Sequence, residues 1–424
     1  MRVSAAFCLA GSLMLSAAVL AAPAAPPKAA DVLNTYGDIA HAMYEDSLTT
    51  ARALQTAVNA FLADPTQAKL VAARNAWKAA RVPYLQTEAY RFGNAVVDEW
   101  EGEVNSWPLD EGLIDYVAAS YGKTSDENPL YTLNIIANKQ LRIGAKQLNA
   151  AVIDKALLRQ LQQAQGVEAN VATGYHAIEF LLWGQDLHGT GAGAGERPAS
   201  DYNVKACTHA NCDRRAQYLK AATDLLIEDL DAMTANWAAN GKARAELGAK
   251  GQNGGLATIL TGIGSLSYGE MAGERMKLGL ILHDPEEEQD CFSDNTHNSH
   301  YYDELGINAV WSGRYTRVNG SVVQGPSFRD YATAKNPDVA KRMDGRLADT
   351  LAKIKKIKDM GDSGKMAYDQ MIAKDNAVGN QMVQDAIDAL IAQTRADEAV
   401  VAALGLKISL EGSDSLDHPS SVTR

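Results

Sequence analysis

The chain has 424 residues, of which 46% are hydrophobic and 22% charged, and its formal net charge is −12. Such a composition is typical of a soluble globular protein, and the length predicts two domains because one ordinary core does not grow so large. An acidic chain has no excess of Lys or Arg to neutralise phosphates, so nucleic-acid binding is not expected. The low content of Phe (six) and Pro (twelve) favours helices over sheets.

The N-terminus has the pattern of a secretory signal. Arg2 precedes an almost continuous apolar run from Ala5 to Leu20, and small residues surround position 21. We expect a signal peptide over residues 1–21 with cleavage after Ala21. No later stretch reaches 18 uninterrupted apolar residues, so the mature chain is not expected to span a membrane.

The rest of the chain predicts an all-α protein with long irregular loops. Apolar residues recur at helical spacing in eight segments: 30–62, 65–92, 129–144, 154–183, 214–243, 257–282, 337–357 and 376–404. Residues 98–128 and 284–326 are rich in Gly, Pro, Asp, Asn and Ser and are expected to be irregular. A glycine-rich loop at 189–195 leads into a polar segment that we take as the domain boundary. The predicted organisation is a helical bundle over 32–205, a second over 206–410, and a disordered tail over 411–424.

Three cysteines remain after the predicted cleavage. In an oxidising compartment Cys207 and Cys212 can close a small loop as a disulfide, which leaves Cys291 unpaired. The alternative is a metal site that also uses His209, but this set lacks a fourth ligand. We favour the disulfide.

The most informative stretch is GYHAIEFLLWGQD, which places His176 and Glu179 one helical turn apart. On a helical wheel this pair shares a side with Phe180 and Trp183, while aliphatic residues occupy the other side, so we expect the helix to be buried all round. The i, i+3 spacing is one that bundle proteins use for divalent metals. A hydrogen-bonded His–Glu pair inside a core explains the same spacing. The paired histidines of the zincin motifs are missing, since position 180 is Phe.

Other polar residues occur on otherwise helical faces. A stripe at 4-3-4-3 spacing indicates either a buried ionic network or the wall of a cavity, and it consists of Trp77, Arg81, Tyr84, Glu88 and Arg91. Glu270 and Glu274 form an i, i+4 acid pair that needs a compensating cation. The loop CFSDNTHNSH brings together Asp294, His297 and His300, for which an ordinary capped turn is the alternative explanation.

Several of these stretches resemble the imelysin-like proteins, which include the iron-regulated protein A group and the insulin-cleaving metallopeptidase-like group. Gly174, His176 and Glu179 match the family's G-x-H-x-x-E motif. The resemblance extends to WKAARVPYLQTEAYRFG, WPLDEGLIDYV, the segment from Cys207 to Cys212 that continues as CDRR, SYGEMAGERM and CFSDNTH. These stretches cover most of the mature chain.

The resemblance implies an exported protein, periplasmic or associated with the outer membrane, with two tandem four-helix bundles and the motif near their interface. It also implies a link to iron acquisition, and therefore a partner in iron transport or at the outer membrane. We expect His176 and Glu179 to bind a divalent metal ion or a metal-associated ligand. Iron is favoured over zinc because thiolate ligands are lacking.

The two motif residues do not complete a metal site. The additional ligands that we consider, in order, are Glu88, Glu270, Glu274, Asp294 and His297. Arg81, Tyr84 and Trp183 are expected to contact the metal ligands on the side away from the metal and to hold them in orientation. A metallopeptidase, with Glu179 as ligand or general base, and a non-catalytic interaction module are the alternative functions.

Overall fold

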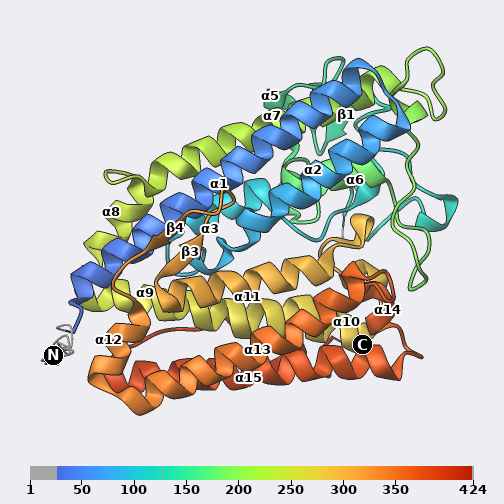
Figure 1. Cartoon of the computed structure of the whole chain (residues 1–424). Helices are drawn as coiled ribbons and strands as arrows, with labels where there is room; N and C mark the ends of the chain where they lie inside the picture. Colours follow the sequence, from blue (N-terminus) through green and yellow to red (C-terminus); the bar gives the residue numbers. More distant parts are fainter. Residues whose placement is uncertain (1–25, 127, 423–424) are drawn as a thin grey trace, which may run out of the picture.

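The computed structural model describes residues 26–126 and 128–422, so the predicted signal peptide lies outside the described residues. The all-α prediction is confirmed: long helices form two bundles, and the only strands in the described residues belong to two short hairpins (Figure 1). The first bundle contains α1 (Ala29–Ala63), α2 (Gln67–Leu85), α6 (Gly174–Trp183) and α7 (Cys212–Trp237). The second contains α9 (Gly251–Ser265), α11 (Thr296–Ser312), α13 (Pro337–Asp362) and α15 (Ala377–Leu404).

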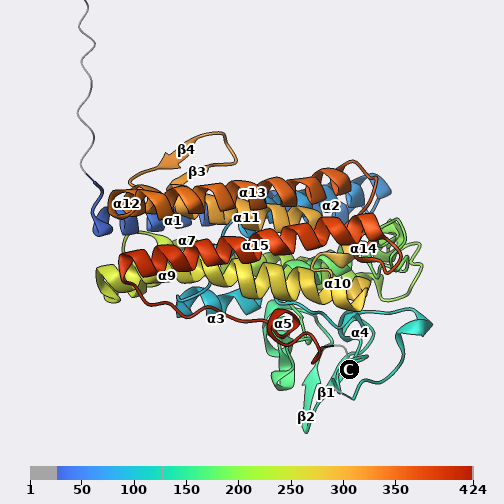
Figure 2. The same cartoon turned by 90° about the horizontal axis from the view of Figure 1, so that it is seen from below.

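Helix α9 does not end at Ser265 but continues as the π-helix η5 (Leu266–Lys277) and then as α10 (Leu278–Leu282). Figure 2 shows α9, α10 and α15 running side by side. π-helical turns are rare and occur frequently at functional sites. Here the π-helix carries Glu270, Glu274 and Arg275 on the side where the two bundles meet.

The two bundles share helix α1. Its N-terminal part, from Val32 to Tyr44, belongs to one hydrophobic cluster, and its C-terminal part, from Leu48 to Phe61, belongs to the other. Helix α7 follows the predicted boundary at residue 205 and nevertheless packs against α1 and α6 of the first bundle. The division at residue 205 stays a prediction, but the packing of α7 and α1 does not follow it.

The shorter elements connect and cover the bundles. The remaining α-helices are α3 (Ala95–Val104), α4 (Glu111–Ile114), α5 (Lys155–Leu161), α8 (Lys242–Ala249), α12 (Phe328–Lys335), α14 (Tyr368–Ile372) and α16 (Asp414–Asp417). The 3₁₀ turns are η1 (Glu88–Tyr90), η2 (Ala119–Tyr121), η3 (Ala164–Gly166), η4 (Ala199–Tyr202), η6 (Pro285–Glu287) and η7 (Cys291–Ser293). Within the described ranges, none of the helices has both the length and the hydrophobicity needed to cross a bilayer.

The helix expected over residues 129–144 does not form: residues 129–139 make turns and irregular segments, and a hairpin follows them. Strands β1 (Gln140–Ile143) and β2 (Lys146–Asn149) pair antiparallel, with Gln140 opposite Asn149. A second hairpin joins β3 (Arg314–Thr316) to β4 (Val322–Gln324). The helix prediction failed because Gly144, with φ +58°, supplies the left-handed turn that closes the first hairpin.

The helix expected over residues 154–183 is interrupted. Helix α5 ends at Leu161, and the chain takes a left-handed conformation at Gln163 (φ 50°) before α6 begins. The backbone N–H of Gln163 donates to Asn170 O, and Asn170 Nδ2 donates to Ala164 O. These polar contacts close a loop that apolar spacing does not reveal.

Two segments expected to be irregular contain helices. Helix α3 lies mainly within residues 98–128, and α11 lies within residues 284–326. Helix α11 is one of the four long helices of the second bundle, yet its buried face includes polar residues such as His300, Asp303 and Glu304. A buried polar face removes the apolar periodicity on which the helix prediction depends.

The helix expected over residues 65–92 ends at Leu85, and the last part of that range forms η1. The C-terminal segment, expected to be disordered, lies against η5. Ser413 and Ser415 are buried there, and Tyr268 donates to Asp417 at 2.7 Å. We expected disorder because the tail has few apolar residues, but polar contacts hold it in place.

Candidate metal site

Helix α6 begins where a glycine is required. Gly174 has φ +80°, and a Cβ on it would lie 2.4 Å from the backbone oxygen of Val104. Any other residue would therefore displace α6 from the C-terminal end of α3. This close approach places His176 and Glu179 in the interior, and both side chains have no exposed surface.

The two motif residues lie beside a third potential ligand, Asp290. His176 Nδ1 lies 3.1 Å from Glu179 Oε2 and 3.7 Å from Asp290 Oδ1. One potential ligand atom from each of the three residues lies within 4.8 Å of the others, and all three residues are buried. Neighbouring ligands around an ion bound at about 2.1 Å are separated by roughly 3 to 3.5 Å, so these three side chains fit a cation with little movement.

Each carboxylate is held by neighbours that leave an oxygen facing the cluster. The backbone N–H of Ser293 donates to Glu179 Oε1 at 3.0 Å. Asp290 Oδ2 accepts from Asn295 Nδ2 and from the hydroxyl of Ser299. His176 Nε2 has no hydrogen-bond partner in the structure. A buried nitrogen without a partner is costly unless a ligand or water meets it.

Arg81 provides the positive charge of the site. Its Nη2 lies 2.8 Å from Asp290 Oδ1, and both side chains are completely buried. Its Nη1 donates to the side-chain oxygen of Asn105. The guanidinium also lies over the rings of Tyr84, at 5.6 Å, and Tyr175, at 5.1 Å. Arg81 thus contacts the carboxylate of Asp290 directly, and Tyr84 contacts Arg81.

The protonation states follow from burial and from these charges. Burial, reinforced by Arg81, lowers the pKa of His176 to about 3, so the ring is neutral near pH 7. Burial and the charge of Asp290 raise the pKa of Glu179 well above its usual value. Burial acts to raise the pKa of Asp290, but Arg81, His176 and two hydrogen bonds outweigh it and keep the pKa below 3.8. Glu179 therefore holds a proton that a cation could replace.

The weaker candidates Glu88 and Glu270 belong to a different buried network. Arg275 Nη2 lies 2.7 Å from Glu88 and 3.0 Å from Glu270, and Arg275 Nη1 lies 2.9 Å from Asp303. Arg91 also contacts Glu270 at 3.2 Å. These carboxylates are already neutralised by guanidinium groups, so they are not placed as ligands of the cluster. The stripe on α2 and η1 thus contributes to two buried ionic networks.

The other candidates also lie outside the cluster. Glu274 accepts a hydrogen bond from the Ser413 hydroxyl at 2.6 Å. His297 Nε2 lies 3.1 Å from Asp362 Oδ1. Asp294 follows η7 with φ 50°, and burial raises its pKa to about 6. None of these three residues belongs to the cluster that His176 forms with Glu179 and Asp290.

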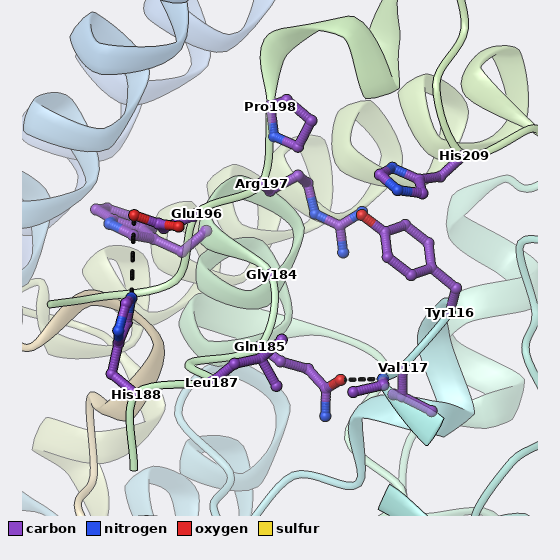
Figure 3. A pocket seen from close by; sticks show the side chains of 12 residues that line it. Tyr116, Val117, Gly184, Gln185, Leu187, His188, Glu196, Arg197, Pro198 and His209 are labelled. Atoms are coloured by element: carbon purple, nitrogen blue, oxygen red, sulfur yellow. Dashed lines mark hydrogen bonds and ion pairs between the residues drawn. The ribbon is translucent and has the colours of Figure 1, made fainter. Parts of the chain in front are cut away.

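Trp183 faces a different part of the molecule. It packs against Trp77 with ring centroids 5.4 Å apart and lines a cavity of about 380 Å³. Figure 3 shows this cavity, with Tyr116, Arg197 and His209 among the residues that line it. That cavity lies beside the loop closed by the Cys207–Cys212 disulfide, where His209 stacks on Tyr116 at 4.5 Å.

Sequence reasoning missed Asp290 and Trp107. Asp290 directly precedes the CFSDNTH stretch, and its position in that polar loop is the only local signal for it. The ring of Trp107 lies 5.1 Å from the ring of His176. Both residues are far from α6 in the sequence, so only the packing of the chain brings them to the site.

The chain is similar to known proteins in sequence and in fold. The family model described as Imelysin (Peptidase_M75) matches residues 40–396. The chain belongs to the imelysin family. An iron-regulated protein A from Synechococcus elongatus is 38% identical over 69 residues, which are 16% of this chain and 19% of that relative. The alignment therefore spans only about a fifth of the relative.

The fold is also similar to that of a solved structure described as an iron-regulated protein A precursor from Parabacteroides distasonis. The TM-score is 0.60, and the match covers 90% of this chain and 97% of that chain at 17% identity. At this identity the likeness concerns the fold alone.

Proposed function

We propose that this imelysin-family protein binds a divalent transition-metal ion through His176, Glu179 and Asp290. The observation that carries the proposal is the convergence of these three completely buried side chains from α6 and the loop before η7. Burial favours the protonated form of Glu179, whereas a bound cation would stabilise the carboxylates of Glu179 and Asp290 in their ionised form. Arg81 balances one of these two negative charges, and the cation would balance the other.

The donor set favours iron among the available metals. One imidazole nitrogen and two carboxylate oxygens suit Fe²⁺ or Mn²⁺, and also accommodate Zn²⁺. The only free cysteine in the described residues, Cys291, is not part of the cluster. Iron also occurs in the names of the two similar proteins, both of which are called iron-regulated protein A or its precursor.

We further propose that the protein acts in iron acquisition after export, in the periplasm or at the outer membrane, together with a transport partner. The signal-like pattern of residues 1–21 and the similarity to iron-regulated protein A support this placement.

Peptide hydrolysis is supported less well than binding. A metallopeptidase needs an open position on its metal and room for a polypeptide at that position. His176, Glu179 and Asp290 all have no exposed surface, so a peptide bond could reach them only after a large rearrangement. Binding requires only that a small ion reach the cluster.

The test is metal binding by the purified mature protein. We expect tight binding of Fe²⁺ under anaerobic conditions, and of Mn²⁺, by calorimetry and by elemental analysis after gel filtration. Glu179→Gln, which nearly preserves the shape of the side chain, and His176→Ala should each weaken binding by at least about tenfold, equivalent to 1.4 kcal/mol.

A matched control is His209→Ala. His209 Nδ1 lies 2.6 Å from Asp201 Oδ1, so it forms a second His–carboxylate pair, but one that lies outside the cluster. Its replacement should leave metal affinity unchanged. Equal affinity in the wild type and in both site variants would refute the proposed site.

A further inference from the structure

A polar cavity of about 750 Å³ lies at the junction of the two bundles, next to the candidate metal site. Its walls come from residues 91–108, from Gln163 and Glu168, from η5 and the start of α10, and from Glu287 and Gln289. The lining contains seven carboxylates and only two cationic side chains, Arg91 and Arg275. The cavity therefore carries a marked excess of negative charge.

The two arginines do not neutralise the whole cavity. Arg91 is engaged with Asp98 and Glu270, and Arg275 with Glu270 and with Glu88. By contrast, Glu99, Glu168, Glu274 and Glu287 form no ion pair with Lys or Arg in the described part of the chain. Walls of one sign around a hollow focus the electric field and raise the local concentration of the opposite ion.

The inner end of the cavity has polar atoms without partners. Asn105 and Gln289 both line it and are 2% and 3% exposed. Asn105 Nδ2 and Gln289 Oε1 have no hydrogen-bond partner in the structure. Such atoms are costly when buried, unless water or a ligand satisfies them. The coordinated water of a hydrated ion can donate to Gln289 Oε1.

The same inner end adjoins the metal cluster. Trp107 lines the cavity and has its ring 5.1 Å from that of His176. Asn105 accepts from Arg81, which pairs with Asp290, and Gln289 is the residue immediately before Asp290. The ring of Trp107 thus borders both the cavity and the imidazole of His176.

We propose that this cavity is a vestibule that collects a hydrated divalent cation and passes it by Trp107 to His176, Glu179 and Asp290, and that its charge rejects metal held in an anionic chelate. The inference rests on the proposed function and specifies the form in which the metal arrives. A hydrated metal ion is attracted by each carboxylate of the cavity that has no cationic partner. A polycarboxylate chelate of iron carries negative charge and is repelled by them.

The test measures association rates with Mn²⁺ as the probe. Stopped-flow tryptophan fluorescence suits this purpose because Trp107 lies against His176. The variant Glu99→Gln/Glu168→Gln changes two exposed residues that form no ion pair, so the fold should be kept. Asp126→Asn/Asp375→Asn removes the same charge at exposed positions that do not line the cavity.

At low ionic strength the vestibule variant should bind Mn²⁺ on the order of three- to tenfold more slowly, while its dissociation rate stays unchanged. The control variant should bind at nearly the wild-type rate, and 0.5 M salt should abolish the difference. Ferric citrate should neither bind nor compete with Mn²⁺.

Equal association rates for the vestibule variant and the wild type would overturn the inference, as would tight binding of ferric citrate. If Mn²⁺ still binds in these cases and His176→Ala abolishes binding, the proposed function survives and only the vestibule fails. If the wild type binds no divalent cation, both proposals fail.

Discussion

Arg81 and Asp290 form a completely buried ion pair that joins α2 to the loop before η7, with 2.8 Å between Nη2 and Oδ1. The pair fixes a carboxylate beside His176 although the two residues are far apart in the sequence. Removing one member of a buried pair leaves the other charge unpaired, which commonly costs about 3–5 kcal/mol.

Arg81→Met should therefore lower the free energy of unfolding by about 3–5 kcal/mol in metal-free protein. Because a bound cation can replace the lost positive charge beside Asp290, saturating Mn²⁺ should raise the melting temperature of this variant more than that of the wild type. Thermal denaturation with and without Mn²⁺ checks both effects. The exposed Arg314→Met serves as control, and an Arg81→Met protein as stable as this control would contradict the role of the pair.

Gly174→Ala should destabilise the protein by at least about 2 kcal/mol, because a positive φ is strained for alanine and the new Cβ would meet Val104 O. Displacement of α6 should also weaken Mn²⁺ binding. Gly166→Ala separates the two causes: Gly166 has φ +73° but open space around its Cβ position, so only the conformational cost of about 1 kcal/mol applies. Denaturant unfolding of both variants measures the difference. Equal losses of stability would contradict the prediction, because they would mean that the contact with Val104 adds no cost.

Glu88→Gln should affect stability and not metal affinity. Glu88 shares Arg275 with Glu270 and Asp303, so its neutralisation leaves the guanidinium with two acidic partners. We expect a loss of about 1–2 kcal/mol in unfolding free energy and an unchanged dissociation constant for Mn²⁺. A tenfold loss of affinity at unchanged stability would instead place Glu88 among the ligands.

His300 should make stability dependent on pH. The side chain is completely buried, neither ring nitrogen has a partner, and Tyr368 packs on the ring at 4.9 Å. Burial lowers its pKa to about 3, with Arg275 and His297 adding to the effect and Asp290 opposing it. Below pH 6.5 the unfolded chain binds a proton that the folded chain does not, so stability is full above pH 6.5 and is lost as the pH falls towards 3.

His300→Phe keeps the ring and removes both nitrogens. The variant should be more stable than the wild type by about 1–2 kcal/mol near pH 7, and this gap should widen as the pH falls from 7 to 4.5. Melting temperatures across that range measure it. A constant gap would mean that His300 does not carry the expected pKa shift.

Cys207→Ser should lower the free energy of unfolding by about 2 kcal/mol, because this is the loop-closure entropy expected for so short a ring. The ring is the one closed by the Cys207–Cys212 disulfide. Metal affinity should not change, because this loop borders the cavity lined by Trp183 and not the cluster. Reduction of the wild type should reproduce the loss, whereas the same treatment of the variant should have no further effect.

Much of the fold could be predicted from the sequence where apolar residues repeat at helical spacing. Helices α1, α13 and α15 lie close to their predicted ranges, since each buries an apolar stripe. The method failed at α11, whose buried face carries His300, Asp303 and Glu304 in place of apolar residues. It failed again between Leu161 and Gly174, where hydrogen bonds of Asn170 replace the helical ones.

At the site, spacing along the chain was enough to predict that His176 and Glu179 share one face of a helix, because residues three apart in a helix do so. The need for glycine at position 174 and the remaining partners of the cluster depend on contacts between distant segments. Asp290 joins the cluster, and Glu88 and Glu270 are taken up by Arg275, because burial forces each charged group to pair with whichever opposite charge the packing brings within reach. Glu270 and Arg275 lie only five residues apart on η5. The pairs Arg81–Asp290 and Glu88–Arg275, however, join residues 209 and 187 positions apart, and no spacing along the chain encodes them.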